Sequence, residues 1–204
     1  YYDGPWQLSQ NSKRTNGIIR WHKGDENAWF NATLMGYWAD WRSSDQIPAR
    51  AVADGRIDRF GFVDPSNGGE SQRYSLSANF GKRCADDILV QGRAYAGYYD
   101  LDLYSNFTYA LDDPANGDQF RQSDQRVFFG GDVSSTWEGR SLFGADTDYT
   151  LGFQTHNDYI WDLELARTRQ RSDLANVRTD DVFTGNYALY ASANTSWNDW
   201  FRTE

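Results

Sequence analysis

Apolar and polar residues alternate with a period of two along most of this chain. The clearest example is the segment 72–81, where one face of an extended strand would carry Tyr74, Leu76, Ala78 and Phe80. The intervening residues are polar: Arg73, Ser75, Ser77 and Asn79. Because successive side chains of a strand point to opposite faces, this pattern predicts a strand with one apolar and one polar face.

Six further segments repeat the alternation: 13–23, 28–41, 88–107, 123–137, 148–161 and 183–197. In the segment 88–107 the apolar parity changes at Leu101 and Leu103, which predicts a β-bulge near Tyr98 or Tyr99. Several segments exceed the ~5–6 residues typical of soluble strands and suit the ~9–11 residues of a tilted strand that crosses a bilayer. No helical period competes with this pattern.

The connections between these segments alternate in length. Short ones are expected at 24–26, 84–87 and 198–199, and long ones at 44–69, 109–122 and 167–180, while 138–147 is longer than its short siblings. Short turns on one side and long loops on the other are typical of outer-membrane barrels. Strands span hydrocarbon only in a closed barrel, so seven or eight strands with free ends imply neighbours outside this segment. We therefore expect an all-β fold: an antiparallel transmembrane β-barrel segment of about seven to eight long strands.

Composition narrows the function classes. Aromatic residues make up 17% of the 204 residues, hydrophobic residues total 39%, and the net charge is −9. The negative charge and the lack of Lys/Arg clusters argue against a nucleic-acid partner. The single cysteine, Cys84, cannot form an internal disulfide. The opening residues YYDGPWQ lack a signal-peptide pattern, and we expect the chain to be a fragment of a longer protein.

Five stretches resemble one protein family. They are YDGPW (2–6), MGYWADWRSSDQIPARAV (35–52), GFVDPSNGGESQRYSLS (61–77), DLDLYSNFTYALDDPANGDQF (100–120) and LYASANTSWNDWFRT (189–203). In order and spacing they are similar to the barrel of proteobacterial TonB-dependent receptors. The resemblance implies that residues 1–204 are part of a 22-stranded outer-membrane barrel whose plug domain and C-terminal closing strand lie outside this segment. It also implies TonB-driven import of a small, scarce ligand, with the outer-membrane lipid, the plug and TonB as partners.

Aromatic residues divide into two predicted groups. Those near strand ends are expected to form membrane-interface girdles: Trp29, Trp38, Trp137, Tyr149, Trp161 and Trp197. Those in outward-facing loops are candidate ligand contacts: Tyr2, Trp6, Phe60, Phe62, Tyr109 and Phe120. The same rings could instead hold the loops together.

No catalytic residue, metal ligand or cofactor site is predicted. The carboxylate pairs Asp112–Asp113 and Asp180–Asp181 could serve acid/base chemistry or calcium, but they lack a supporting ligand series and fit solvated loops better. His22 and His156 fall on the polar parity, where a lumen position and hydrogen bonding are expected.

Three functional hypotheses follow. The first is a TonB-dependent receptor, with ferric siderophore, cobalamin and oligosaccharide all open as ligands. The second is a passive porin, whose selectivity would come from lumen charges such as Arg73, Arg126 and Asp132. The third is a soluble all-β carbohydrate-binding module that uses the loop aromatics.

Overall fold

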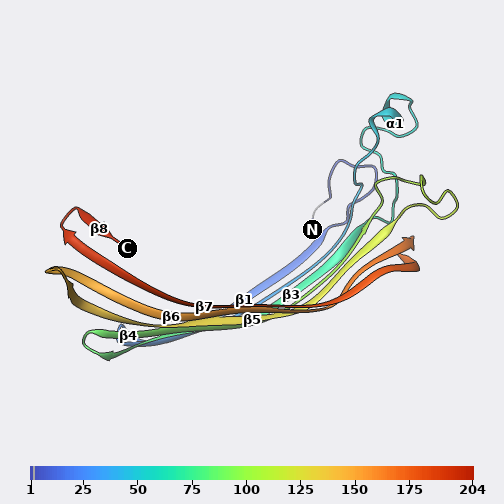
Figure 1. Cartoon of the computed structure of the whole chain (residues 1–204). Helices are drawn as coiled ribbons and strands as arrows, with labels where there is room; N and C mark the ends of the chain where they lie inside the picture. The colour runs from blue at the N-terminus through green and yellow to red at the C-terminus, as the bar shows by residue number, and fades with distance from the viewer. Residues whose placement is uncertain (2) are drawn as a thin grey trace.

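The computed structural model, which describes residue 1 and residues 3–204, is one antiparallel sheet of eight strands in sequence order. The strands are β1 (Lys13–Gly24), β2 (Ala28–Arg42), β3 (Gly68–Ala85), β4 (Ile88–Ser105), β5 (Phe120–Leu142), β6 (Ala145–Arg169), β7 (Ser172–Asn198) and β8 (Phe201–Thr203). A short helix, α1 (Ala49–Ala53), lies between β2 and β3. The sheet is one layer thick and curves along its strands (Figure 1).

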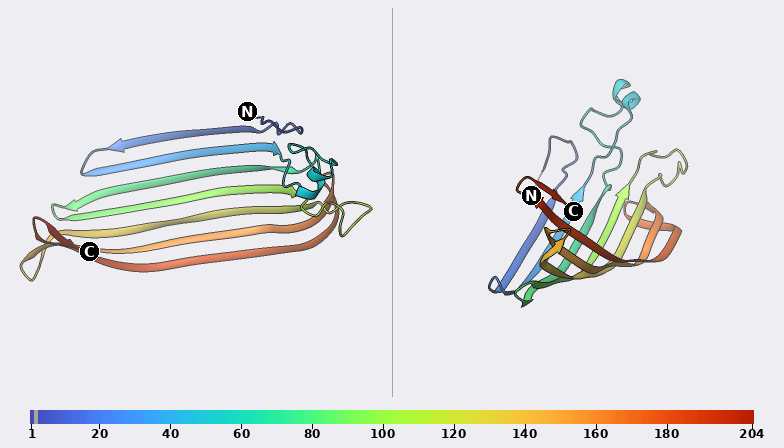
Figure 2. Two further views of the ribbon diagram at one scale, coloured as in Figure 1. Left: turned by 90° about the horizontal axis from the view of Figure 1, so that it is seen from above. Right: turned by 60° about the vertical axis from the view of Figure 1, so that its left-hand side comes forward.

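Seen from above, the seven long strands lie side by side, with the β2–β3 and β4–β5 connections together at one end (Figure 2). Among the described strands, β1 pairs only with β2 and the short β8 only with β7, so the sheet is open. All seven predicted strand segments are confirmed. Helices long and apolar enough to cross a membrane are absent from the residues that the structure describes.

Two expected connections are wrong because the strands are longer than their alternation shows. The segment 167–180 is not a long loop, since β6 and β7 run through it and turn at Gln170 and Arg171, which both adopt positive φ. The segment 138–147 is likewise mostly strand, with the turn at Phe143 and Gly144. Asp180 and Asp181 therefore lie within β7 and not in a loop.

The predicted bulge near Tyr98 or Tyr99 is also wrong. Pairing of β4 with β3 and with β5 runs through both tyrosines without a shift. Leu101 and Leu103 therefore share a face with Arg93. The apolar parity changes because the polar face itself carries leucines at this end of β4, and not because the strand contains an extra residue. Bulges occur elsewhere, for example where β5 meets β6 between Ser123 and Gln125.

The continuous register sorts the side chains of the strands into two faces. The side of the sheet that includes the directly paired row Ile19, Leu34, Leu76, Ala96 and Phe129 is called the apolar face. The polar face is the other side, which includes the paired row His22, Asn31, Asn79, Arg93, Asp132 and Gln154. Predicted alternation thus becomes two coherent surfaces, because each strand keeps its parity relative to its neighbours.

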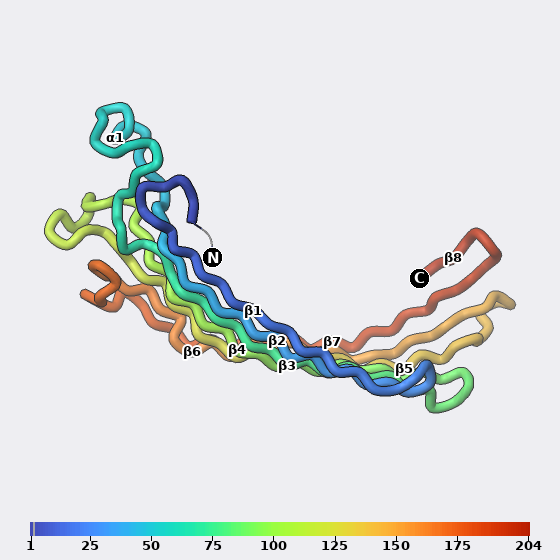
Figure 3. The backbone as a smooth tube through the Cα atoms, turned by 180° about the vertical axis from the view of Figure 1, so that it is seen from behind, coloured from blue at the N-terminus to red at the C-terminus, as the bar shows by residue number. Residues whose placement is uncertain are grey.

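Neither face is covered by another layer, as the backbone seen from behind also shows (Figure 3). Within the described residues, the buried apolar side chains are Leu8, Ala39, Ile160 and Ala166, which is far too little for a conventional core. On the apolar face Leu189 is 80% exposed and Ile19 is 68% exposed. The sheet therefore holds together through its backbone ladder and cross-strand pairs, with its apolar surface still unburied.

Glycines directly opposite aromatic residues recur across the sheet. The pairs in register are Gly36–Tyr74, Trp29–Gly81, Phe80–Gly92, Gly97–Phe128, Tyr95–Gly130 and Gly152–Tyr190. In each pair the ring lies over the glycine, so that a Cβ built on Gly97 would be 2.2 Å from Cζ of Phe128. Such pairing lets large rings lie flat and allows a sheet to coil strongly.

We expect Gly97→Ala to destabilise the protein by about 1–3 kcal/mol, because the new methyl group displaces Phe128. The matched control is Gly17→Ala, also on a strand, where a Cβ meets nothing within 4 Å and the change should stay within about 0.5 kcal/mol. Thermal unfolding of the two variants and of the parent protein measures both changes. Equal melting temperatures for the two variants would contradict this role of the ring–glycine pair.

Candidate functional site

A buried polar cluster joins three connections at the long-loop end of the sheet. Its centre is Gln119, which is 2% exposed and immediately precedes β5. Its amide nitrogen donates to Oγ of Ser66 at 2.7 Å and to Oδ1 of Asn67 at 3.1 Å, both in the β2–β3 connection. Its amide oxygen accepts from Oγ1 of Thr168 at 3.0 Å and from the backbone N–H of Arg171 at 2.9 Å. One side chain thus ties together the β2–β3, β4–β5 and β6–β7 connections.

Arg171 reinforces this junction from the turn between β6 and β7. Its Nε donates to the carbonyl of Ser66 at 2.7 Å, and a terminal nitrogen donates to the carbonyl of Trp41 at 3.3 Å. The guanidinium lies 5.2 Å from the ring centroid of Tyr104. Positive φ is uncommon for residues such as Gln170 and Arg171, and these contacts maintain it.

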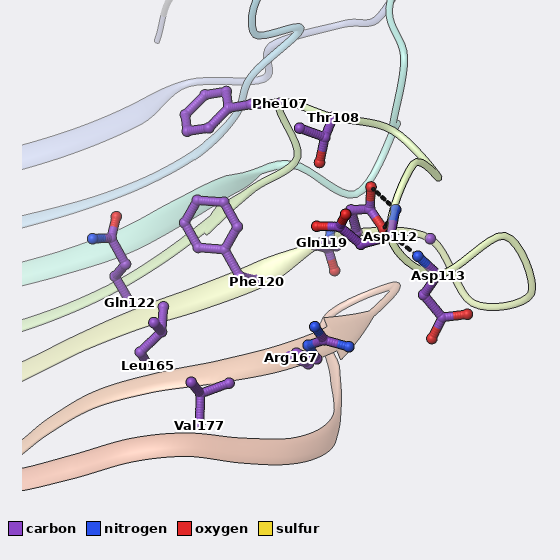
Figure 4. A pocket seen from close by; sticks show the side chains of 12 residues that line it. Phe107, Thr108, Asp112, Asp113, Gln119, Phe120, Gln122, Leu165, Arg167 and Val177 are labelled. Carbon is purple, nitrogen blue, oxygen red and sulfur yellow. Dashed lines mark hydrogen bonds between the residues drawn. The ribbon is translucent and has the colours of Figure 1, made fainter.

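Beside this junction lies a pocket of ≈ 520 Å³ (Figure 4). Phe107 and Phe120 form one wall, with ring centroids 5.6 Å apart, and Leu165 and Val177 extend the apolar lining along β6 and β7. The loop side of the pocket is polar and is formed by Thr108, Asp112, Asp113, Asp118, Gln119 and Arg167. The pocket therefore combines an apolar floor with a charged rim, which is typical of small-molecule sites.

The carboxylates at this rim organise the loop backbone. The carboxylate of Asp118 accepts from the backbone N–H of Asp113 at 2.8 Å and of Leu111 at 2.6 Å, while Asp113 accepts from the backbone N–H of Asn116 at 3.0 Å. The predicted pair Asp112–Asp113 is thus part of a turn, and Asp113 is a backbone cap.

Hydrogen bonds lower the pKa of both loop carboxyl groups. For Asp113 the leading cause is the side-chain amide of Asn116. For Asp118, desolvation raises the pKa, but hydrogen bonds from the N–H groups of Asp113, Asp112 and Leu111 and from the hydroxyl of Thr108 together outweigh it, and the pKa lies below its ordinary value. The ionised carboxylates of Asp113 and Asp118 accept these hydrogen bonds. Their contribution to the stability of the loop is therefore complete above the ordinary carboxyl pKa and is lost as the pH falls through their lowered pKa values.

The predicted loop aromatics do not gather at one place. Phe120 lines the pocket described above, and Tyr109 lines a neighbouring pocket of ≈ 470 Å³ with α1 residues. Trp6 and Phe60 contact each other edge to face, with ring centroids 5.5 Å apart, and Phe62 is half-buried close to Phe60 in the chain. Tyr2 lies outside the described residues. The prediction that these rings bind ligand stays a prediction, with Phe120 and Tyr109 lining pockets.

Sequence reasoning missed three pocket residues: Phe107, Leu165 and Val177. Val177 was assigned to a long loop that is in fact strand β7. The sequence feature that points to this apolar lining is the parity change at Leu101 and Leu103. It marks the part of β4, near the long loops, where the polar face carries apolar residues.

Both histidines are hydrogen-bonded on the polar face. Nδ1 of His22 lies 2.6 Å from Oδ1 of Asn31. Nδ1 of His156 lies 2.7 Å from the hydroxyl of Tyr95, and its Nε2 lies 2.9 Å from Oδ2 of Asp158. The described residues contain no group of three or more His, Cys, Asp or Glu side chains placed to hold a metal ion.

We expect Gln119→Leu to loosen the long-loop end, because the amide of Gln119, in the β4–β5 connection, satisfies groups of the β2–β3 connection and of the β6–β7 hairpin. Each buried group left without a partner costs about 1–3 kcal/mol. Hydrogen exchange should rise in the β2–β3 and β4–β5 connections while the middle of β5 stays protected. Gln122→Leu, at an exposed glutamine three residues further along the chain in β5, is the control; equal exchange in the two variants would rule out the junction.

Comparison of the chain with protein-family profiles, with curated protein sequences and with solved structures finds no match.

Proposed function

We propose that this chain forms part of the wall of a transmembrane β-barrel in the outer membrane of a Gram-negative bacterium. We further propose that this barrel belongs to a TonB-dependent receptor that imports a small, scarce ligand. The observation that carries the first step is the single-layer sheet with an uncovered apolar face. Lipid would cover that face, and further strands would pair with the edges of β1 and β7.

The exposed surface supports this reading. A compact monomer of this 23.4 kDa mass would expose about 9,700 Å², by the usual scaling with mass. The chain exposes 13376 Å². The excess fits a barrel wall, whose two faces contact lipid and a lumen, and does not fit a soluble carbohydrate-binding module with its own core.

Several tryptophans and tyrosines of the apolar face lie at two levels, while Phe129, Phe153 and Tyr187 lie between them. On β6, Tyr149 belongs to the level near the short turns and pairs with Trp137. Tyr159 and Trp161 belong to the level near the long loops, where Tyr98 lies 6.1 Å from Trp161 between ring centroids. The two tyrosines of β6 are ten residues apart, which spans roughly 33 Å along a strand and about 25 Å across a membrane at the usual tilt.

These levels match the height of the apolar band of outer-membrane barrels. Trp38, Trp137, Tyr149 and Trp161 of the predicted girdles share the apolar face. Trp29 is an exception, since it lies over Gly81 on the polar face.

The finer step, from barrel to receptor, rests on the resemblance of the five sequence stretches and on the ligand-sized pocket beside Phe120. The second candidate is a passive porin, which the charged polar face favours. Planar-bilayer recording separates the two. A receptor with a plugged lumen conducts no steady ion current, whereas a porin does.

Spin-label accessibility along β7 tests membrane insertion. We expect labels at 183, 187, 189 and 191 to favour oxygen, which concentrates in lipid, and labels at 184, 186, 188 and 192 to favour a water-soluble nickel chelate. The reason is that odd positions lie on the apolar face and even positions on the polar face. The measurement uses the full-length protein in lipid, in a Cys84→Ser background because Cys84 is exposed.

Two results would refute the barrel wall. One is equal accessibility to the nickel chelate at odd and even positions, as expected for a strand in water on both sides. The other is protection of the odd positions from both reagents, as expected for a soluble core.

A further inference from the structure

The middle of the polar face carries surplus positive charge although the chain as a whole is acidic, at −9. We consider the five consecutive cross-strand rows from that of Arg93 to that of Arg14. The arginines in these rows are Arg14, Arg20, Arg73, Arg93 and Arg126, and the aspartates are Asp124, Asp132 and Asp158, while Asp180 of β7, which pairs with Arg178, lies at the level of the Arg14 row. The negative charge of the protein therefore lies mainly outside this surface.

The three aspartates are already paired. Asp132 pairs with Arg93, and Asp124 and Asp158 both pair with Arg126. Within the described part of the chain, Arg14, Arg20 and Arg73 have no carboxylate within 4.0 Å.

Two of these three arginines are held by rings. The guanidinium of Arg73 lies 4.7 Å from the ring centroid of Phe128, and that of Arg14 lies 4.9 Å from that of Tyr37. Stacking orients a guanidinium while leaving its N–H groups available at the edge.

A pocket of ≈ 440 Å³ lies at the Arg93 end of this surface, on β4 to β7, and is lined by Arg93, Tyr95, Gln154, His156, Asn186 and Ala188, among others. Arg93 contacts Asp132 through Nε, and its side chain is 65% exposed, so its terminal nitrogens can reach a ligand. Gln154 and Asn186 add exposed amide donors from β6 and β7.

His156 is fixed at the wall of this pocket by Tyr95 and Asp158, which contact its two ring nitrogens. Tyr95 reaches across β5 to His156 because residue 130 is glycine, where a Cβ would lie 2.6 Å from the tyrosine hydroxyl. The wall is therefore rigid beside the exposed donors.

We propose that this pocket binds a small solute that carries a carboxylate or phosphate group, with Arg93, Gln154 and Asn186 as its donors. The proposal rests on the proposed function, since the solute must reach the polar face from a water-filled lumen. The exposed terminal nitrogens of Arg93 can bind two oxygens of such a group at once, and the amides of Gln154 and Asn186 line the same pocket.

The test places a reporter cysteine at Ala188→Cys, which lines the pocket without donating to it, in a Cys84→Ser background of the full-length protein in membranes. Reaction rates are compared for an anionic and a cationic methanethiosulfonate of similar size. We expect the anionic reagent to be favoured, and Arg93→Gln to reduce the anionic-to-cationic rate ratio by about two-fold, because it removes one positive charge from the pocket lining and salt screens charges across water. Inorganic phosphate or citrate at constant ionic strength should slow the anionic reagent in the parent and not in Arg93→Gln.

Arg178→Gln is the control, because this arginine lies on the exposed loop-side part of β7 and pairs with Asp180; it should leave the ratio unchanged.

A second reporter, Leu189→Cys, lies on the apolar face. If both reagents reach Ala188→Cys at equal rates, unaffected by Arg93→Gln or by either anion, the anion site is refuted and the barrel wall stands. If neither reagent reaches Ala188→Cys while both reach Leu189→Cys, the proposed function itself fails. Protection by phosphate alone, or by citrate alone, identifies which anion the site prefers.

Discussion

Backbone hydrogen bonds between neighbouring strands hold this chain in one sheet, and their register decides the side of the sheet on which each side chain lies. From β1 to β5 the pairing continues without a shift across the central rows. A slip of one residue in any strand would move its apolar residues to the polar face. With few buried apolar contacts to correct such a slip, the ladder and the matched side-chain rows are what specify the structure.

Glycine and aromatic residues complement this ladder. Large rings need room on a curved, single-layer sheet, and a glycine directly across the strand pair provides it, as at Gly97 and Phe128. The same device brings Tyr95 over Gly130 to His156, two strands away. Shape and polar chemistry on this face therefore depend on the same small residues.

At the long-loop end, most of the buried side chains are polar and not apolar. Gln119 and Asn67 are among the most buried side chains of the described chain, and their hydrogen bonds connect loops that are distant in sequence. This arrangement places Phe120 beside Leu165 and Val177 and so forms the pocket. The acidic residues of the loops mostly cap their own backbone, whereas the arginines on the polar face project from the strands.

The sequence alone determined the all-β class, the seven long strands and the two unlike faces, because a period of two is a local property of each strand. It failed at 167–180 and at Tyr98–Tyr99, where a strand carries residues unlike those of its middle and local alternation gives no guide. Among the aromatic residues that the sequence proposes as ligand contacts, Phe120 and Tyr109 line pockets, and so do Phe107, Leu165 and Val177, which the sequence does not single out. Only the tertiary structure decided which residues share a pocket, how Gln119 joins the loops and which arginines lie unpaired, because these follow from the register between strands and from contacts across long sequence separations.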